Sequence, residues 1–250
     1  MIHIQDFTFN SFQTRCSVVW DDSLSCAIVD PGCSTPAELA ELTSFISEHG
    51  LKPACIMLTH GHFDHVLGVA ELASRYSGSA ESPACDVSAS RPLPVYMHPA
   101  DKTTLANNEY FSKWFGAPLP AAFETVDICE ACSSEDCADG PDAAKGISVI
   151  EVGGLRFKVI ETPGHTPGGV SYYEPAEKVL FSGDSLFAGA IGRTDHPGGD
   201  YDQLMKSILE KLVTLEGSVS VLPGHGPCTD IAREGMTNPF LLPFNEPYED

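Results

Sequence analysis

The segment Thr59-His60-Gly61-His62-Phe63-Asp64-His65, written THGHFDH, places three histidines and one aspartate within seven residues. It directly follows the apolar run 54–58, which predicts a buried strand that ends where the polar residues begin. A single metal rarely takes four side chains from so short a loop, so we expect further ligands elsewhere in the chain. The fold should therefore bring other polar loops to the end of this strand.

Three more polar residues follow later predicted strands: His165 in ETPGHTPGG, Asp184 in LFSGDSLF and His225 in LPGHGP. The glycines and prolines beside them allow the sharp turns that hold side chains outward. Imidazoles and carboxylates suit zinc, iron or manganese, and the absence of a thiolate makes a closed structural zinc site a poor match. The candidate metal ligands are His60, His62, Asp64, His65, His165, Asp184 and His225.

A shared carboxylate would let these side chains serve two metals. If Asp184 bridges, each metal takes three other protein ligands and keeps room for water. Two metals roughly 3.5 to 4 Å apart would share a hydroxide, because a cation lowers the pKa of bound water from ~15.7 toward ~7. The pattern therefore predicts a nucleophile that is available at neutral pH, with Asp64 and Asp184 as the candidates for proton handling.

The composition narrows the possible partners. The chain has 250 residues, which suits one domain over residues 1–250, and its 14 Lys and Arg against 35 Asp and Glu give a net charge of −21. Such a charge repels a polyphosphate backbone, so nucleic acid is not an expected partner. The start MIHIQDFTFN lacks a secretory pattern and no run of apolar residues is long enough to span a membrane, so we expect a cytoplasmic protein with no membrane partner. The oligomeric state stays open.

The apolar patterns predict an α/β fold with strands and helices in both halves of the chain. Thr35 with Pro36 and Glu38 forms a capping box for a helix, Asp200 caps a second helix, and a third follows the ligand segment over 66–72. Two sheets packed face to face with helices outside would satisfy this order. The predicted strands cover residues 16–20, 26–29, 54–58, 95–97, 147–152, 155–160, 169–173, 179–181 and 218–222, and the first two suggest an antiparallel opening.

Two stretches, 77–90 and 126–146, look like loop insertions because they are polar or acidic and offer little that could be buried. The second contains Cys129, Cys132 and Cys137, and Cys85 lies in the first. A CxxC half-site without a second half does not complete a zinc clamp. Nine cysteines in an ordinary globular sequence favour reduced thiols over disulfides.

The complete ligand pattern resembles the metallo-β-lactamase superfamily. The segments THGHFDH, PGH, SGDSLFAGAIGRTDHPGGD and GHGP, with the late NPFL at 238–241, are similar to its short glyoxalase II-like (hydroxyacylglutathione hydrolase-like) members. The resemblance covers nearly the whole chain apart from the two insertions. It implies a four-layer αβ/βα sandwich and two divalent metals, zinc before iron or manganese. It also implies the ligand division: His60, His62 and His165 on one metal, Asp64, His65 and His225 on the other, and Asp184 between them.

Several residues near these motifs have two interpretations. Arg193 in GRTD either meets an anionic group of the substrate or forms a structural pair with Asp195, and the structural pair is slightly favoured. His196, next to a proline and two glycines, either lines the mouth of the pocket or is an exposed loop histidine, and the second interpretation is favoured. His98 before Pro99 is interpreted as a helix start. The 25 residues 226–250 are too few for the helical domain with which glyoxalase II enzymes bind glutathione. The chain also has Arg15, Cys16 and Ser17 where those enzymes often have Asn, Thr or Cys followed by Tyr.

Three functions remain to be distinguished. The first is a hydrolase that cleaves a small thioester, such as a 2-hydroxyacyl thioester similar to S-lactoylglutathione, through a metal-bridging hydroxide. The second is a persulfide dioxygenase that binds one iron through His60, His165 and Asp184. The third is a non-catalytic metal-binding or interaction protein that uses the acidic cysteine loop. The ordered, open ligand set favours the hydrolase.

Overall fold

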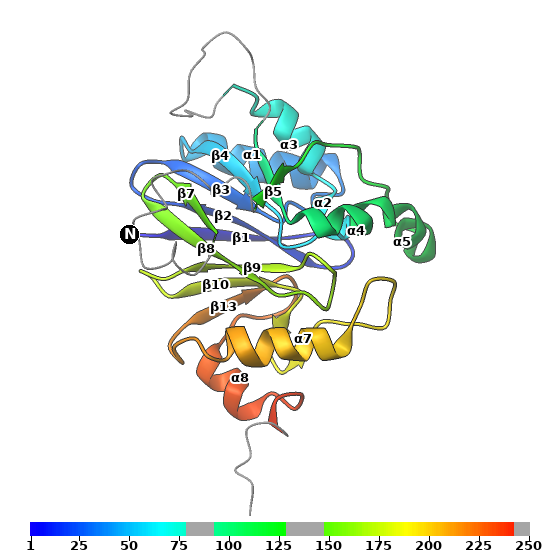
Figure 1. The fold of residues 1–250 in the computed structure, drawn as a ribbon. Helices are drawn as coiled ribbons and strands as arrows, with labels where there is room; N and C mark the ends of the chain where they lie inside the picture. Colours follow the sequence, from blue (N-terminus) through cyan, green and yellow to red (C-terminus); the bar gives the residue numbers. More distant parts are fainter. Residues whose placement is uncertain (79–92, 129–147, 243–250) are drawn as a thin grey trace, which may run out of the picture.

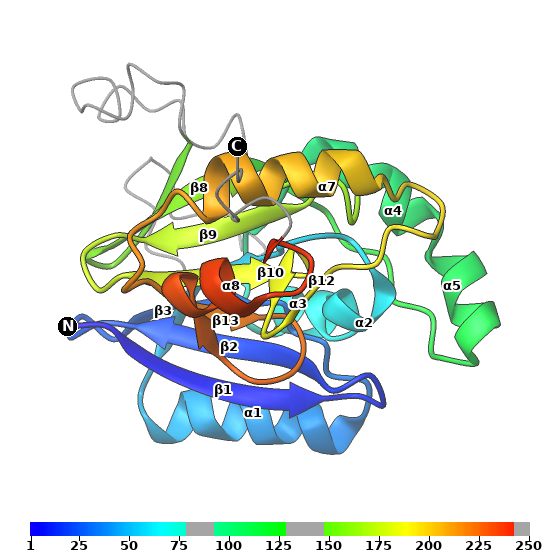
Figure 2. The same ribbon diagram turned by 90° about the horizontal axis from the view of Figure 1, so that it is seen from below.

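The computed structural model describes residues 1–78, 93–128 and 148–242, and within them two six-stranded sheets pack against each other. Helices cover the outer face of each sheet, which gives the four layers seen in Figures 1 and 2. This confirms the predicted four-layer αβ/βα sandwich. The assignment of all 250 residues to a single domain stays a prediction.

The first sheet has the order β1-β2-β3-β4-β5-β6. Its first three strands are antiparallel, as the sequence predicted, and β3 to β6 are parallel. The parallel part carries its C-terminal strand ends, including that of β4, to one edge of the sheet. The strands are β1 His3–Phe9, β2 Thr14–Trp20, β3 Ser25–Val29, β4 Lys52–Met57, β5 Val95–Met97 and β6 Val126–Asp127.

The second sheet has the order β14-β13-β10-β9-β8-β7 and is antiparallel except for the parallel pair β10 and β13. A separate two-stranded sheet, β11 with β12, follows β10. The strands are β7 Val149–Val152, β8 Leu155–Glu161, β9 Val170–Glu174, β10 Val179–Gly183, β11 Leu186–Phe187, β12 Ala190–Ile191, β13 Ser220–Pro223 and β14 Thr229–Asp230.

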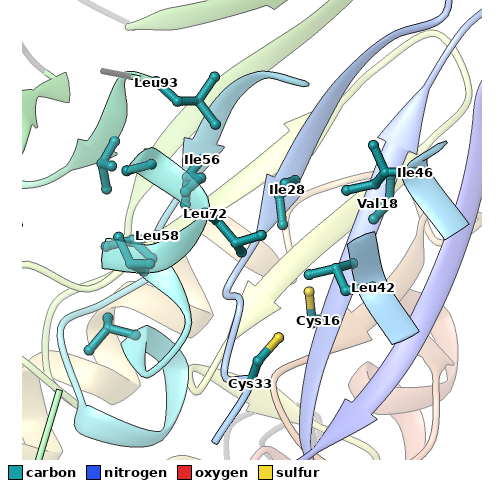
Figure 3. Close-up of a cluster of buried hydrophobic side chains, with 14 of the residues drawn as sticks. Cys16, Val18, Ile28, Cys33, Leu42, Ile46, Ile56, Leu58, Leu72 and Leu93 are labelled. Atoms are coloured by element: carbon teal, nitrogen blue, oxygen red, sulfur yellow. The ribbon is translucent and has the colours of Figure 1, made fainter. Parts of the chain in front are cut away.

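Three apolar cores hold the layers together. Between the sheets, Val29 and Met57 of the first sheet share a cluster with Phe157 and Tyr172 of the second. The Tyr172 hydroxyl donates to the Leu58 carbonyl at 2.7 Å, which ties the sheets together beside the ligand segment. A second cluster joins the first sheet to its helices (Figure 3), and a third joins the second sheet to the C-terminal helices. The ligand segment is thus anchored to a rigid core.

The helices begin where the sequence supplies caps. The Thr35 hydroxyl accepts from the Glu38 amide, and the Glu38 carboxylate accepts from the Thr35 amide, so the predicted capping box is confirmed. Asp200 caps α7 as predicted, and a π-helix, Ile208–Leu212, continues it. The other helical elements include a short 3₁₀ helix capped by His98. Their bounds are α1 Pro36–Glu48, α2 Phe63–Val66, α3 Val69–Arg75, the 3₁₀ helix Pro99–Asp101, α4 Lys102–Ala106, α5 Asn108–Phe115, α7 Tyr201–Ser207 and α8 Ile231–Thr237.

Two boundaries differ from the sequence prediction. The expected helix at 66–72 is two helices, and the first begins at Phe63, inside the ligand segment. They separate at Gly68, whose amide donates to the Pro31 carbonyl at 2.8 Å, and a side chain there would bring its Cβ within 2.9 Å of that oxygen. The expected insertion at 126–146 starts later, because β6 pairs with β5 and Ile128 is buried between the sheets.

Residues 79–90 and 129–146 of the two predicted insertions lie outside the described residues, as do Cys85, Cys129, Cys132 and Cys137. The cysteines in the described part are free, namely Cys16, Cys26, Cys33, Cys55 and Cys228, and the reduced state of all nine cysteines stays a prediction. Among the helices that the structure describes, none has the length and apolar character needed to cross a membrane.

Candidate metal centre

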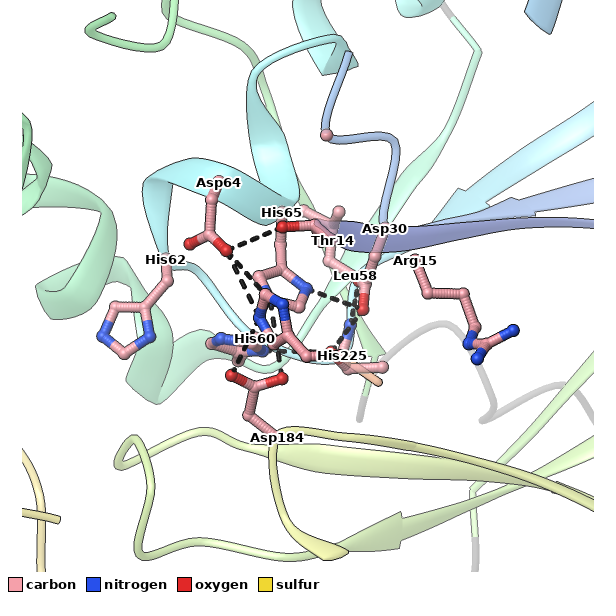
Figure 4. Close-up of polar contacts among 12 residues, drawn as sticks. Thr14, Arg15, Asp30, Leu58, His60, His62, Asp64, His65, Asp184 and His225 are labelled. Atoms are coloured by element: carbon pink, nitrogen blue, oxygen red, sulfur yellow. Dashed lines mark hydrogen bonds and ion pairs between the residues drawn. The ribbon is translucent and has the colours of Figure 1, made fainter. Parts of the chain in front are cut away.

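The predicted ligands come together at one edge of the sandwich, at the ends of strands from both sheets (Figure 4). His60 and His62 follow β4, and α2 turns Asp64 and His65 back toward them. The second sheet contributes the rest of the set from the loops after β8, β10 and β13, namely His165, Asp184 and His225. Residues that are distant in sequence therefore meet where the two sheets adjoin.

The first donor group consists of His60, His62 and His165, whose nearest ligand atoms all lie within 4.8 Å of one another. His62 Nδ1 and His165 Nε2 approach to 3.0 Å. All three side chains are buried. Two imidazole nitrogens converging at this distance form part of the donor arrangement that a divalent metal requires.

The second donor group consists of Asp64, His65 and His225, again within 4.8 Å. The Nε2 atoms of His65 and His225 are 3.2 Å apart, and Asp64 Oδ2 lies 3.4 Å from His225 Nε2. Asp184 touches both groups: its Oδ1 is 3.5 Å from His65 Nε2, and its Oδ2 is 3.5 Å from His165 Nε2. One carboxylate therefore faces both donor groups.

Asp30 at the end of β3 orients one histidine of each group. It accepts the Thr59 hydroxyl at 2.6 Å, which leaves the Thr59 oxygen to accept from His60 Nδ1 at 3.0 Å. His65 Nδ1 lies 3.1 Å from the same Asp30 oxygen, to which it donates. With a hydrogen on Nδ1, each imidazole has its lone pair on Nε2, the atom that points into the centre. Asp30 is not among the predicted site residues, because in the sequence it is the first residue of a DPG turn.

Backbone carbonyls orient two further ligands in the same way. His165 Nδ1 donates to the Arg193 carbonyl at 2.8 Å, and His225 Nδ1 donates to the Phe12 carbonyl at 3.0 Å. Arg15 of β2 holds the His225 loop, since its Nε donates to the Pro223 carbonyl at 2.9 Å. Its guanidinium points away from the ligands (Figure 4). Arg15 therefore supports the loop that carries His225.

Asp101 connects the loops that carry the first donor group. It is fully buried, and it accepts the amides of Gly61 at 2.7 Å and Gly168 at 2.6 Å and the Thr166 hydroxyl at 2.9 Å. Burial raises the pKa of this carboxyl, while these hydrogen bonds oppose the rise. Asp101 is therefore a positioning residue, and no motif in the sequence marks it as one.

Replacement of Asp101 by Asn should weaken metal binding without removing a ligand. The amide presents a donor where the carboxylate accepts, so either the Gly61 or the Gly168 amide loses its partner. We expect the metal affinity to fall roughly 10- to 100-fold, the range typical of groups that orient ligands. Competition with a chromogenic chelator measures this, and the exposed Asp22→Asn is the control. An unchanged affinity in Asp101→Asn would show that the two loops hold their positions without this carboxylate.

Close packing at the centre requires glycine before His225. A Cβ on Gly224 would lie 2.2 Å from Asp184 Oδ1 and 2.8 Å from His65 Cε1. Gly183 before Asp184 has φ +50°, and its Cβ would approach Thr59 Oγ1 to 2.5 Å. The GD and GH dipeptides of the sequence are thus needed for close approach of the backbone to the ligand set.

Opposite charges shift the pKa values of the second group. Burial lowers the pKa of His225, but Asp184 and Asp64 outweigh it and raise this pKa to about 11. Burial raises the pKa of Asp64, yet His65 and His225 bring it down to about 2. At neutral pH the metal-free protein therefore carries a proton on His225 and none on Asp64.

Metal binding at neutral pH should consequently release protons. A ligating imidazole needs a free lone pair, so the proton on His225 must leave when Nε2 binds a metal. We expect release of about one proton or more per chain at pH 7, and weaker metal binding as the pH falls. Calorimetric titrations in two buffers of different ionisation enthalpy measure the number released. His225→Ala should reduce the release, and a binding enthalpy independent of the buffer would contradict the prediction.

Buried polar atoms without hydrogen-bond partners are a second sign that the donor set suits a metal. His60 Nε2 and Asp184 Oδ1 are buried and have no hydrogen-bond partner. Buried polar atoms without a partner are costly, and here they lie among other imidazole nitrogens and carboxylate oxygens. A divalent cation would satisfy them, so the residues present fit the metals that the sequence predicted.

Arg193 and His196, which each had two interpretations from the sequence, lie beside the first donor group. The exposed Arg193 side chain pairs with Asp195, with Nε to Oδ1 at 2.9 Å, which agrees with the structural interpretation. His196 is half-buried, and its ring lies 5.0 Å from those of both His62 and His165. The structure therefore supports the less favoured interpretation, in which the HPGG segment places this histidine at the border of the first donor group.

Comparisons with known proteins agree with this geometry. The family model of the metallo-beta-lactamase superfamily matches residues 10–84 and 86–225. Hydroxyacylglutathione hydrolase GloC of Haemophilus influenzae is 33% identical over 244 residues, which cover 96% of this chain and 98% of that protein. The crystal structure of the BLEG-1 B3 metallo-beta-lactamase superposes with a TM-score of 0.76 at 33% identity, covering 96% of this chain and 99% of that chain. The crystal structure of TTHA1623 in a di-iron-bound form superposes with a TM-score of 0.71 at 32% identity, covering 95% of this chain and 100% of that chain.

Fold and site together are those of a metallo-hydrolase with a cluster of histidine and aspartate donors for divalent metal. The chain belongs to the metallo-beta-lactamase superfamily.

Proposed function

We propose that this protein is a binuclear metal-dependent hydrolase that cleaves small 2-hydroxyacyl thioesters similar to S-lactoylglutathione. The observation that carries the proposal is the position of Asp184, whose two oxygens face His65 on one side and His165 on the other. A carboxylate so placed can serve two metals at once. The related hydroxyacylglutathione hydrolase, 33% identical over nearly the whole chain, supports the thioester class.

In this proposal, His60, His62 and His165 hold one metal, Asp64, His65 and His225 hold the other, and Asp184 is shared. Zinc is our first choice, and iron is a real alternative because one similar structure is a di-iron form. When bound, the two metals would supply an ionised water at neutral pH and polarise the acyl carbonyl. A cytoplasmic location and a small-molecule substrate, without nucleic acid or membrane partners, remain part of this proposal.

The protein's own side chains orient the centre and keep it charged. Thr14 donates to Asp64 Oδ2 at 2.8 Å, which fixes the carboxylate toward His225. The low pKa of Asp64, about 2, keeps it ionised and able to accept a hydrogen bond from a reacting water. His60, Asp64 and His65 are themselves buried, which limits access of bulk water to these ligands.

The test combines metal counting with two activity assays on the same metal-loaded preparation. We expect about two metals per chain and hydrolysis of S-lactoylglutathione. His225→Ala should retain about one metal, because it removes a donor from the second group only. His49→Ala, at an exposed helix end, is the matched control.

The competing functions give different results. One iron per chain and oxygen uptake on glutathione persulfide, without thioester cleavage, would identify a persulfide dioxygenase. Metal binding without either activity would favour a non-catalytic role. The second donor group argues against the dioxygenase, because Asp64, His65 and His225 converge as closely as the first group and would have no metal function.

A further inference from the structure

Four phenylalanines lie around the ligand segment, and we call them the aromatic wall: the rings of Phe12, Phe63 and Phe115 contact one another, and the Phe111 ring contacts His62. Phe111 and Phe115 lie one turn apart on α5, and α5 contacts α2 of the ligand segment. The Phe12 ring is 5.1 Å from that of Phe63 and 5.4 Å from that of Phe115, both edge to face. Such geometry is favourable and fixes the orientation of the rings.

Residues of the wall contact both donor groups, Phe111 through its ring and Phe12 through its backbone carbonyl. The Phe111 ring lies 5.1 Å from that of His62 in the first group. Phe12 belongs to the turn between β1 and β2, and its carbonyl accepts from His225 Nδ1 in the second group at 3.0 Å. In Figures 1 and 2, α5 and the β1–β2 turn lie at the same end of the sandwich. A substrate held at the centre would therefore extend along these rings.

Part of the wall is open to solvent. Phe63 and Phe111 are buried, Phe12 is half-buried, and Phe115 is 45% exposed although two rings hold it. An immobilised, exposed phenylalanine beside a reactive centre offers apolar surface at little further cost in side-chain entropy. Contact with an apolar group would remove this surface from water.

The charges around the wall do not suit an anionic thiol carrier. Arg15 is engaged by the carbonyls of Pro223 and Gly226, and Arg193 is engaged by Asp195. On α5 itself, Lys113 pairs with Glu109 at 2.7 Å. The protein as a whole has a net charge of −21. A carrier with several carboxylates or phosphates would thus meet occupied cations and a negative field.

Resting on the proposed function, we infer that the aromatic wall binds the thiol half of the substrate and selects an uncharged aryl or alkyl group. The small 2-hydroxyacyl half would then be placed at the donor groups, while the apolar thiol half lies against Phe115 and Phe12. The preferred substrates are accordingly thioesters of apolar thiols, and anionic thiol carriers are cleaved less efficiently.

The test uses two thioesters with the same lactoyl group, one of benzyl mercaptan and one of glutathione. In the metal-loaded protein, kcat/KM should be higher for the benzyl thioester. Phe115→Ala should lower kcat/KM for the benzyl thioester about tenfold, mainly through KM, and change that for the glutathione thioester by less than about twofold. Trp114→Ala is the control, because Trp114 is 72% exposed and contacts Tyr110 instead of the wall. Unchanged thermal unfolding in both variants would exclude a folding defect.

A second measurement separates failure of this inference from failure of the proposed function. A benzyl thioether of hydroxyacetone cannot be hydrolysed as a thioester, and its binding is measured by calorimetry. If neither thioester is cleaved but Phe115→Ala weakens thioether binding about tenfold, the hydrolase proposal fails and the wall still selects apolar groups. If both thioesters are cleaved but glutathione is preferred, or Phe115→Ala affects both substrates equally, the inference is overturned and the hydrolase remains.

Discussion

Replacement of Asp184 by Asn is expected to lower kcat/KM for thioester hydrolysis on the order of a thousandfold, which corresponds to about 4 kcal/mol of transition-state stabilisation. Asp184 is the residue that faces both donor groups, with Oδ1 toward His65 and Oδ2 toward His165 and His225. An amide keeps the shape but offers one oxygen and no charge. It therefore cannot serve two cations, and their mutual repulsion is no longer offset.

Steady-state kinetics and metal content, measured on one preparation, test this expectation. The stoichiometry should fall together with the rate, since loss of the shared ligand weakens both metals. Asp202→Asn on the exposed side of α7 is the control for the same chemical change. An Asp184→Asn enzyme with full metal content and nearly full activity would rule out a bridging role.

Removal of metal is expected to lower the unfolding temperature by roughly 8 to 16 °C. With free metal at about a thousand times its Kd, binding adds about 4 kcal/mol to the free energy of unfolding. In a domain of about this size, 1 kcal/mol corresponds to roughly 2 to 4 °C. Each donor group takes ligands from the loops of both sheets, for example His62 with His165, so a bound metal links two halves that are otherwise held by apolar packing.

Differential scanning calorimetry before and after chelation and dialysis measures the difference. Re-addition of metal should restore the original transition, which excludes irreversible damage. His225→Ala should show a smaller difference than the parent protein, because its first donor group is intact. If the metal-free and metal-loaded proteins unfold at the same temperature, the donor groups do not bind metal tightly in the native state.

Most of the regular structure could be predicted because local signals and tertiary packing agree. The capping box at Thr35 and the cap at Asp200 specify helix starts, and the apolar runs between glycine and proline turns become strands. β1 is absent from the predicted strands because its sequence HIQDFTF alternates irregularly between polar and apolar residues, and only pairing with β2 makes it a strand. α5 is absent from the predicted helices because it is short. Its packing face, with Phe111 and Phe115, becomes apparent only when the helix lies against α2 of the ligand segment.

The candidate ligands could be read from the sequence because each follows a strand and stands beside glycine. The residues that orient these ligands could not be identified from the sequence. Asp30, Asp101 and Arg15 act on residues that are distant in the chain, as in the bond from Arg15 Nε to the Pro223 carbonyl. An aspartate in a DPG or PAD segment has the appearance of an ordinary turn or helix-start residue. Only the packing of the loops shows which ligand it orients.

The position of Asp30 has a consequence for the order in which metals bind. Its Oδ2 atom accepts from both Thr59, which orients His60, and His65 Nδ1. The two donor groups therefore share a single proton acceptor. A metal that polarises one imidazole strengthens the hydrogen bonds that lead to Asp30, directly from His65 or through Thr59 from His60, and changes the basicity available to the other. In the binuclear enzyme proposed above, the affinity of each metal would by thermodynamic linkage depend on the presence of the other, and Asp30 would carry this coupling between the two donor groups.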